Sequence, residues 1–195
     1  TSFHSTVFHV VIASRYWELG LAALLDAVPS PRFDPAEIDQ ERQVILEEIR
    51  QGRDSPMRVV SEQLFRHAYR QHPYRNPVIG RRATVSAFRR EDLRAFHRRW
   101  YGPSNLTLVV VGDVEAAAVL AAARSLGPTR GARAPALPPF AEPEQRGPRA
   151  AVSVAEVQDA YLAIAFHVPG LAHADVPCVD LGAAILGQGD SSRLH

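Results

Sequence analysis

Apolar and polar residues form two kinds of pattern along this chain. Three stretches are dense in β-branched and aromatic side chains, which favours strands; they are residues 6–13, 105–111 and 160–168. Elsewhere apolar positions recur every three or four residues, which predicts helices over 17–28, 35–52, 90–100 and 176–186. Two more helices are predicted, one that begins at 55–56 and an Ala-rich one that ends near 127. Together these elements predict an α+β fold, in which helices pack on one face of an antiparallel sheet.

The start of the helix over 35–52 is marked clearly. Asp34 stands at the N-cap position, Pro35 at the first helical position and Glu37 at the third. Each residue type suits its place, since an Asp side chain accepts backbone N–H groups and Pro needs no hydrogen bond there.

A segment without periodicity divides the chain. Residues 128–149 are rich in Pro, Gly, Arg and Ala, as in a linker. We therefore predict a first domain over 1–127 and the beginning of a second over 150–195. A strand ending in Phe-His-Val and followed by a helix occurs on both sides of the linker, so the two domains are expected to form a tandem repeat with an incomplete second copy.

Composition narrows the function classes. The formal net charge is +1, all basic residues are Arg, and they scatter through every segment, so no field for nucleic acid or anionic lipid is expected. No apolar run reaches the roughly 20 residues that cross a bilayer. A single cysteine, Cys178, excludes an internal disulfide and a Cys-based zinc site.

Two carboxylates on the helix over 35–52 are the candidate functional residues. Glu41 and Glu48 are seven residues apart, which places them on one face, two turns from each other. That face is predicted to be the apolar one, between Val44 and Ile45. A buried carboxylate needs an ion-pair partner or a metal; the pattern alone favours ion pairs with nearby Arg side chains and leaves the metal site open.

Residues 41–50, Glu-Arg-Gln-Val-Ile-Leu-Glu-Glu-Ile-Arg, resemble the zinc-ligand helix of the pitrilysin/insulinase family, which includes insulin-degrading enzyme, pitrilysin and mitochondrial processing peptidase. Further segments resemble the family in the same order: Thr1-Ser2 with Thr6-Val7-Phe8, His72-Pro73-Tyr74 with Pro77 and Gly80, Tyr101 with 105–114, Ala160-Tyr161 with Phe166 and Pro169, and then Leu186-Gly187 with 191–194. The resemblance covers essentially the whole chain.

The resemblance implies a zinc site. In this family two His of a His-x-x-Glu-His motif and one distant Glu bind Zn²⁺, and the Glu of the motif is the general base. Position by position, Glu48 matches the distant zinc ligand and Glu41 the acidic residue that supports it. The motif itself is absent from this sequence, so no catalytic residue is expected in it, and the general base is expected upstream of Thr1.

The resemblance thus implies that the intact protein is a zinc metalloendopeptidase for peptides or unfolded polypeptides, whereas this chain alone is expected to be inactive. Two other classes stay open: a non-catalytic peptidase-like subunit that binds peptide or pairs with an active partner, and a structural module with Glu41 and Glu48 in ion pairs. Expected partners are a substrate polypeptide and a second peptidase-like subunit or copy. The expected compartment is a bacterial cytoplasm or periplasm.

Overall fold

Helices dominate the computed structural model, which describes residues 1–126, 136–137 and 140–194. In chain order they are η1 Ser14–Tyr16, α1 Trp17–Ala27, α2 Pro35–Gly52, α3 Pro56–Ala68, η2 Pro73–Arg75, α4 Arg82–Ala87, α5 Arg90–Trp100, η3 Pro103–Asn105, α6 Ala116–Leu126 and α7 Val176–Gly187, where η marks a 3₁₀ turn. The long helices lie where the apolar periodicity predicts them, whereas the short α4 was not expected.

Local chemistry explains where α2 begins. The Oδ1 atom of Asp34 accepts a hydrogen bond from the backbone N–H of Ala36 at 2.9 Å, and Pro35 is the first helical residue. The predicted N-cap is therefore confirmed. It satisfies one of the N–H groups that every helix start leaves without an intrahelical partner.

The predicted antiparallel sheet is wrong. In the part of the chain that the structure describes, no residue belongs to a β-strand, and 6–13, 106–111 and 160–168 run as extended or irregular backbone. β-branched residues favour extended backbone, but a strand also needs a neighbour that shares its hydrogen bonds. The α+β class and its repeated sheet therefore give way to a helical architecture.

These extended segments keep a strand-like alternation of exposure. Val110 is 40% exposed and Val111 91%, so one side of the backbone faces the protein and the other faces solvent. Residues 10–12 lie over α1, where a Cβ at Gly20 would meet Ile12 Cγ2 at 3.2 Å. The segments thus alternate in exposure as strands do, without forming a sheet.

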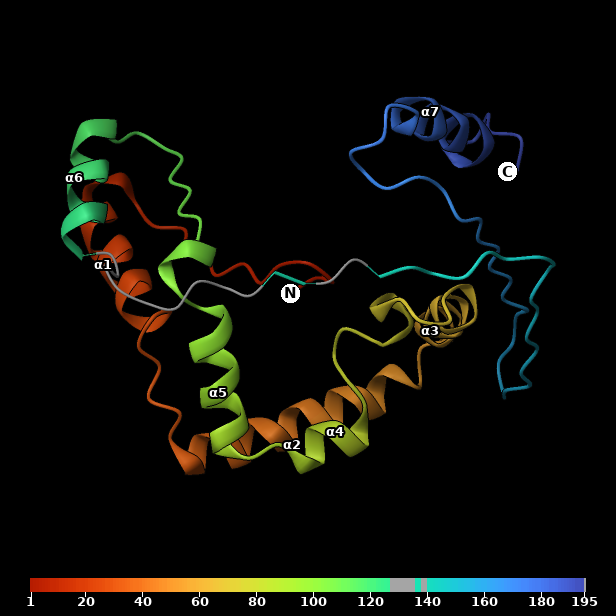
Figure 1. Cartoon of the computed structure of the whole chain (residues 1–195), viewed down its shortest axis with the longest axis horizontal. Coiled ribbons are helices and arrows are strands. Elements are labelled where there is room, and N and C mark those ends of the chain that lie inside the picture. Colours follow the sequence, from red (N-terminus) through yellow and green to blue (C-terminus); the bar gives the residue numbers. More distant parts are fainter. Residues whose placement is uncertain (127–135, 138–139, 195) are drawn as a thin grey trace.

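Figure 1 shows how the helices are arranged. α1 and α6 pack side by side at one end of the molecule, and α4 packs on α2, which runs across it. α3 lies at the other end, and α7 stands apart beyond it. The extended N-terminal segment runs between the two ends.

The core is small for a chain of this length. Among the described residues, the buried apolar side chains are Leu21 of α1, Val85 of α4 and Val119 of α6. The chain exposes 15998 Å², whereas a compact protein of 21.4 kDa exposes about 9,100 Å². Much apolar surface is therefore left uncovered.

Two further features bear on the sequence predictions. The single cysteine, Cys178, is exposed on α7. In the described ranges, no helix combines the length and the apolar character that a bilayer crossing needs. Residues 128–135 and 138–139 of the predicted linker lie outside the described residues, and the division at 127 and 150 stays a prediction.

Candidate functional site

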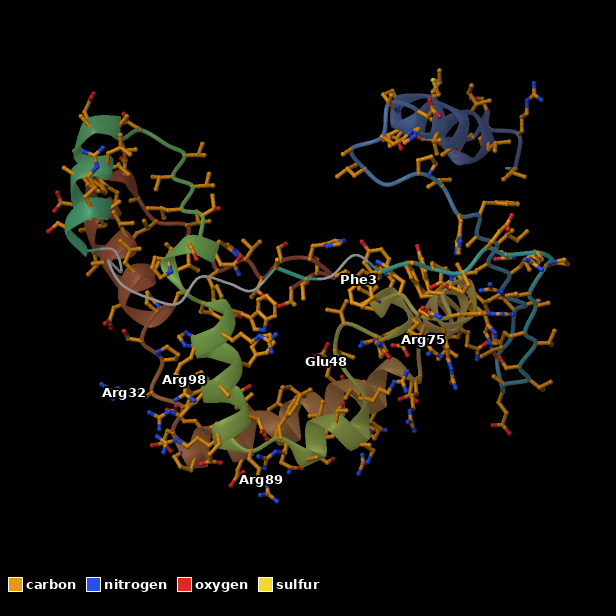
Figure 2. All side chains as sticks on the ribbon, viewed as in Figure 1. Phe3, Arg32, Glu48, Arg75, Arg89 and Arg98 are labelled. Atoms are coloured by element: carbon orange, nitrogen blue, oxygen red, sulfur yellow. The ribbon has the colours of Figure 1, made fainter. Side chains whose placement is uncertain are left out.

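Helix α2 carries both candidate carboxylates. Glu41 and Glu48 stand on it seven residues apart, which corresponds to about 10.5 Å along the helix axis. Figure 2 shows Glu48 on the side of α2 that faces the extended N-terminal segment, where Phe3 is labelled. The helix therefore presents Glu48 toward the interior of the arc that the chain forms.

The face of α2 that carries these residues is less buried than its sequence predicts. The side chain of Glu48 is 59% exposed, and Val44 on the same face is 54% exposed. Ile45, Leu46 and Ile49 are half-buried. The two carboxylates therefore need no partner to offset burial, so burial alone does not argue for a metal.

Arg58 of α3 is a cationic neighbour of Glu48. The Arg58 Nη1 lies 4.0 Å from Glu48 Oε1, and the Arg58 Nε lies 3.4 Å from Glu62 Oε1. Gly52, the last residue of α2, makes room for this guanidinium, because a Cβ there would lie 2.8 Å from Arg58 Cζ. Exposed contacts of this length contribute little, so the Glu48 carboxylate is loosely held.

Glu41 borders a pocket of about 270 Å³ between α2, α4 and α5. The pocket is lined by Phe33, Asp34, Glu37, Ile38, Glu41, Arg42, Ile45, Val85, Phe88 and Leu93. Arg42 forms part of its wall, where Nη1 donates to Asp39 Oδ1 at 2.6 Å and Nη2 to the Phe88 carbonyl at 2.8 Å. Arg42 thereby ties α2 to the segment between α4 and α5, close to Glu41.

The opposite side of α2 holds an ordinary surface ion pair. The Arg50 guanidinium donates to Glu47 through Nε at 2.9 Å and through Nη2 at 2.7 Å. These hydrogen bonds lower the pKa of Glu47 and raise the pKa of Arg50. Glu47 is thus a neighbouring carboxylate with a partner of its own, which makes it a control for Glu48.

The donor set of the described residues does not suffice for zinc. They contain no group of three or more His, Cys, Asp or Glu side chains placed to hold a metal ion. Catalytic zinc takes three protein ligands and an open position. Glu48 could supply one of these ligands, but the described residues bring no two further ligands beside it.

Aromatic side chains gather around Tyr74, in the loop that follows α3. Its ring lies 4.6 Å from that of Phe3, 5.5 Å from that of Tyr69 and 4.3 Å from that of His72, between centroids. Its hydroxyl is hydrogen-bonded to the His4 ring. This cluster joins the N-terminal segment to the loop; the sequence analysis missed it, because no local spacing links Phe3 to Tyr74.

Comparison with known protein families identifies the chain. Residues 1–82 match the family model described as insulinase, peptidase family M16, and residues 87–195 match the one described as the peptidase M16 inactive domain. The chain belongs to peptidase family M16, the insulinase family. The resemblance inferred from residues 41–50 and from the loop at His72 is confirmed.

Relatives in this family carry names of zinc proteases and processing peptidases. The chain is 30% identical over 200 residues to zinc protease PqqE of Helicobacter pylori, which covers 100% of this chain and 45% of that protein. It is 33% identical over 123 residues to the chloroplastic stromal processing peptidase of Oryza sativa subsp. japonica, covering 59% of this chain and 10% of that protein.

A solved structure agrees with this assignment. The crystal structure of a protease from Helicobacter pylori superposes with a TM-score of 0.78 at 28% identity, over 93% of this chain and 45% of that one. The chain therefore spans less than half the length of the Helicobacter pylori relatives that it matches.

Proposed function

We propose that this chain is part of a zinc metalloendopeptidase of family M16, in which Glu48 supplies one zinc ligand and Glu41 supports the site. The remaining ligands and the general base belong to a His-x-x-Glu-His motif elsewhere in a longer protein. The substrates are peptides or unfolded polypeptides, and a second peptidase-like subunit or copy is a possible partner. The observation that carries the proposal is the match of both M16 family models across the chain.

The geometry of α2 agrees with this role for Glu48. Its carboxylate is exposed, and its cationic neighbour stands at 4.0 Å, so little has to be broken before it binds a metal. Glu41 lies two turns away beside the Arg42 contacts that tie α2 to the segment before α5. Since α2 is capped and regular from Pro35 to Gly52, it fixes the spacing of the two carboxylates.

A non-catalytic peptidase-like subunit is the second candidate. One observation favours it, because the model matched by residues 87–195 describes an inactive domain. In that case the longer protein would carry the His-x-x-Glu-His positions substituted and would bind peptide or an active partner. A purely structural role with both carboxylates in ion pairs is less well supported. The contact of Glu48 with Arg58 is long, at 4.0 Å, and Glu41 lines a pocket.

Zinc binding by the longer protein tests the proposal. We expect one zinc per chain in the wild type and at least about 100-fold weaker affinity in Glu48→Gln, because a ligand is lost. Glu41→Gln is expected to weaken the affinity about 10- to 100-fold, as for other residues that support metal ligands. The measurement is competition with a chelating dye, with metal content determined by mass spectrometry.

Glu47→Gln is the matched control. It removes the same charge from the neighbouring position on the other side of α2, where the carboxylate pairs with Arg50. Equal zinc affinities of Glu48→Gln and Glu47→Gln would refute the metal role of Glu48. Absence of zinc from the wild-type longer protein would favour the non-catalytic subunit instead.

A further inference from the structure

A carboxylate near the end of the predicted Pro-rich linker is bound by the backbone after α3. Glu142 accepts hydrogen bonds from three consecutive backbone N–H groups. Its Oε1 atom accepts the N–H of Arg70, and its Oε2 atom accepts the N–H groups of Gln71 and His72, both at 2.8 Å. Three convergent N–H groups form a nest that suits an anion. The sequence separation of about 70 residues makes this a long-range contact.

The same segment also caps the C-terminal end of α3, which is the helix Pro56–Ala68. The Arg149 Nη1 donates to the carbonyls of His67 at 2.9 Å and Ala68 at 3.0 Å, and the His167 Nε2 donates to that of Ala68 at 2.8 Å. The last carbonyls of a helix have no intrahelical partner and carry partial negative charge. A guanidinium and an imidazole therefore match the end of α3 in both hydrogen bonding and charge.

Ring contacts and an amide contact extend the interface. The His167 ring stacks on Tyr69 at 5.0 Å, with 20° between the planes, and Phe140 meets His72 edge-on at 5.6 Å. Gln63 of α3 and Ser153 exchange hydrogen bonds at 3.1 and 3.2 Å. Residues between 140 and 167 thus contact α3 and its following loop at several independent points.

Charge favours the bound state of Glu142. Burial raises the pKa of its carboxyl, but the three backbone N–H groups and the Arg149 charge outweigh burial and lower that pKa to about 2. The carboxylate is therefore ionised at neutral pH, which is the form that accepts all three N–H groups.

We propose that Glu142, Arg149 and His167 form a clasp that fixes residues 140–167 onto the C-terminal end of α3 and the loop 69–72. The clasp joins the end of the Pro-rich linker and the residues that follow it to α3 and the loop after α3. If so, any change in the position of α7 relative to residues 1–126 arises after residue 167. Residues 140–149 then belong with residues 1–126 and do not act as a free linker. The proposal is independent of zinc and of the peptidase assignment.

Hydrogen exchange of the full chain at neutral pH tests the clasp. In Glu142→Gln we expect the amide protons of Arg70, Gln71 and His72 to exchange at least tenfold faster than in the wild type. In Arg149→Gln the peptide that spans the end of α3 and residues 69–72 is expected to exchange faster as well. Mass spectrometry of peptic fragments from 66–76 gives the rates.

Two variants with the same charge changes are the controls. Glu144→Gln and Arg146→Gln alter exposed side chains between Glu142 and Arg149, and both are expected to leave the rates at 70–72 within twofold of the wild type. Rates in Glu142→Gln equal to those in Glu144→Gln would overturn the clasp. If Glu142→Gln unfolds the whole chain, α2 will also exchange freely, and Arg149→Gln then decides the question. Faster exchange confined to residues 66–76 in Arg149→Gln supports the clasp. Exchange rates equal to those of Arg146→Gln overturn it.

Discussion

Two carboxylates of this chain have a lowered pKa for different reasons. Glu47 is held by the flexible side chain of Arg50 on the surface of α2. Glu142 is held by backbone N–H groups whose positions are set by the loop after α3. Fixed backbone donors lose less conformational entropy on binding than a long exposed side chain does, so Glu142 is the carboxylate with the larger expected effect on stability.

Acid should therefore remove the contribution of Glu142. Its pKa is about 2 in the folded chain and 4.5 as the ordinary value, so the folded state binds fewer protons between these limits. The stabilisation is fully present above pH 4.5 and is lost as the pH falls toward 2. The difference in free energy of unfolding between wild type and Glu142→Gln, measured with urea, is expected to be full at pH 5 and to shrink steadily as the pH falls to 2.

Glu144→Gln again serves as the control and should show no such pH-dependent difference. A gap between wild type and Glu142→Gln that stays constant from pH 5 to pH 2 would contradict the ionic role of Glu142.

At the scale of the single element, helix α2 depends on its N-cap residue, Asp34. The Asp34 side chain accepts the N–H of Ala36, and this position also lies at the edge of the pocket beside Glu41. Weakening the cap would fray the turn that precedes Glu41 rather than the one that carries Glu48.

We expect Asp34→Ala to lower the free energy of unfolding by about 1 kcal/mol, as is usual for a lost N-cap. Asp34→Asn keeps an oxygen that accepts the same N–H and should cost much less. Urea denaturation followed by circular dichroism measures both changes. Equal losses in Ala and Asn variants would mean that the charge of Asp34, and not its hydrogen bond, stabilises the helix.

Helices were predictable from the sequence because their signals are local. Asp34, Pro35 and the apolar spacing after them define α2 within a few residues of chain. The sheet was predicted wrongly because pairing depends on a neighbour far along the chain, and the alternation at Val110 and Val111 reports only which side is exposed. β-branched composition is thus evidence for extended backbone and not for a sheet.

In the candidate site, too, the features set by local sequence were predicted and those set by distant contacts were not. The seven-residue spacing placed Glu41 and Glu48 on one helix, but it overestimated their burial, because the degree of burial depends on which elements cover α2. Neither the approach of Arg58 to Glu48 nor the binding of Glu142 by residues 70–72 has a signal in the local sequence. Both contacts arise only when distant segments meet.

The whole molecule is open rather than compact. Its surface of 15998 Å² exceeds by far the roughly 9,100 Å² of a compact protein of the same mass. Extended apolar segments such as 106–111 contribute to this excess. An open chain has less surface left to expose when it unfolds.

The dependence of unfolding on urea should reveal this openness. The unfolded chain exposes about 31,000 Å², so unfolding of this structure exposes roughly two thirds of the new surface that a compact chain would. Because the m-value is proportional to that new surface, we expect about two thirds of the m-value of a compact protein of this length. An m-value as large as that of a compact protein would contradict the open arrangement.

The exposed Cys178 on α7 gives this openness a practical use. It is the single cysteine of the chain, and both tryptophans, Trp17 and Trp100, belong to the part before the Pro-rich segment. A fluorescent acceptor attached to that thiol therefore labels one known point on α7, and energy transfer from the two indoles reports the distance between the parts. This sequence therefore offers both the donors and an attachment point for the acceptor, so the distance of α7 from the first part of the chain can be followed in solution.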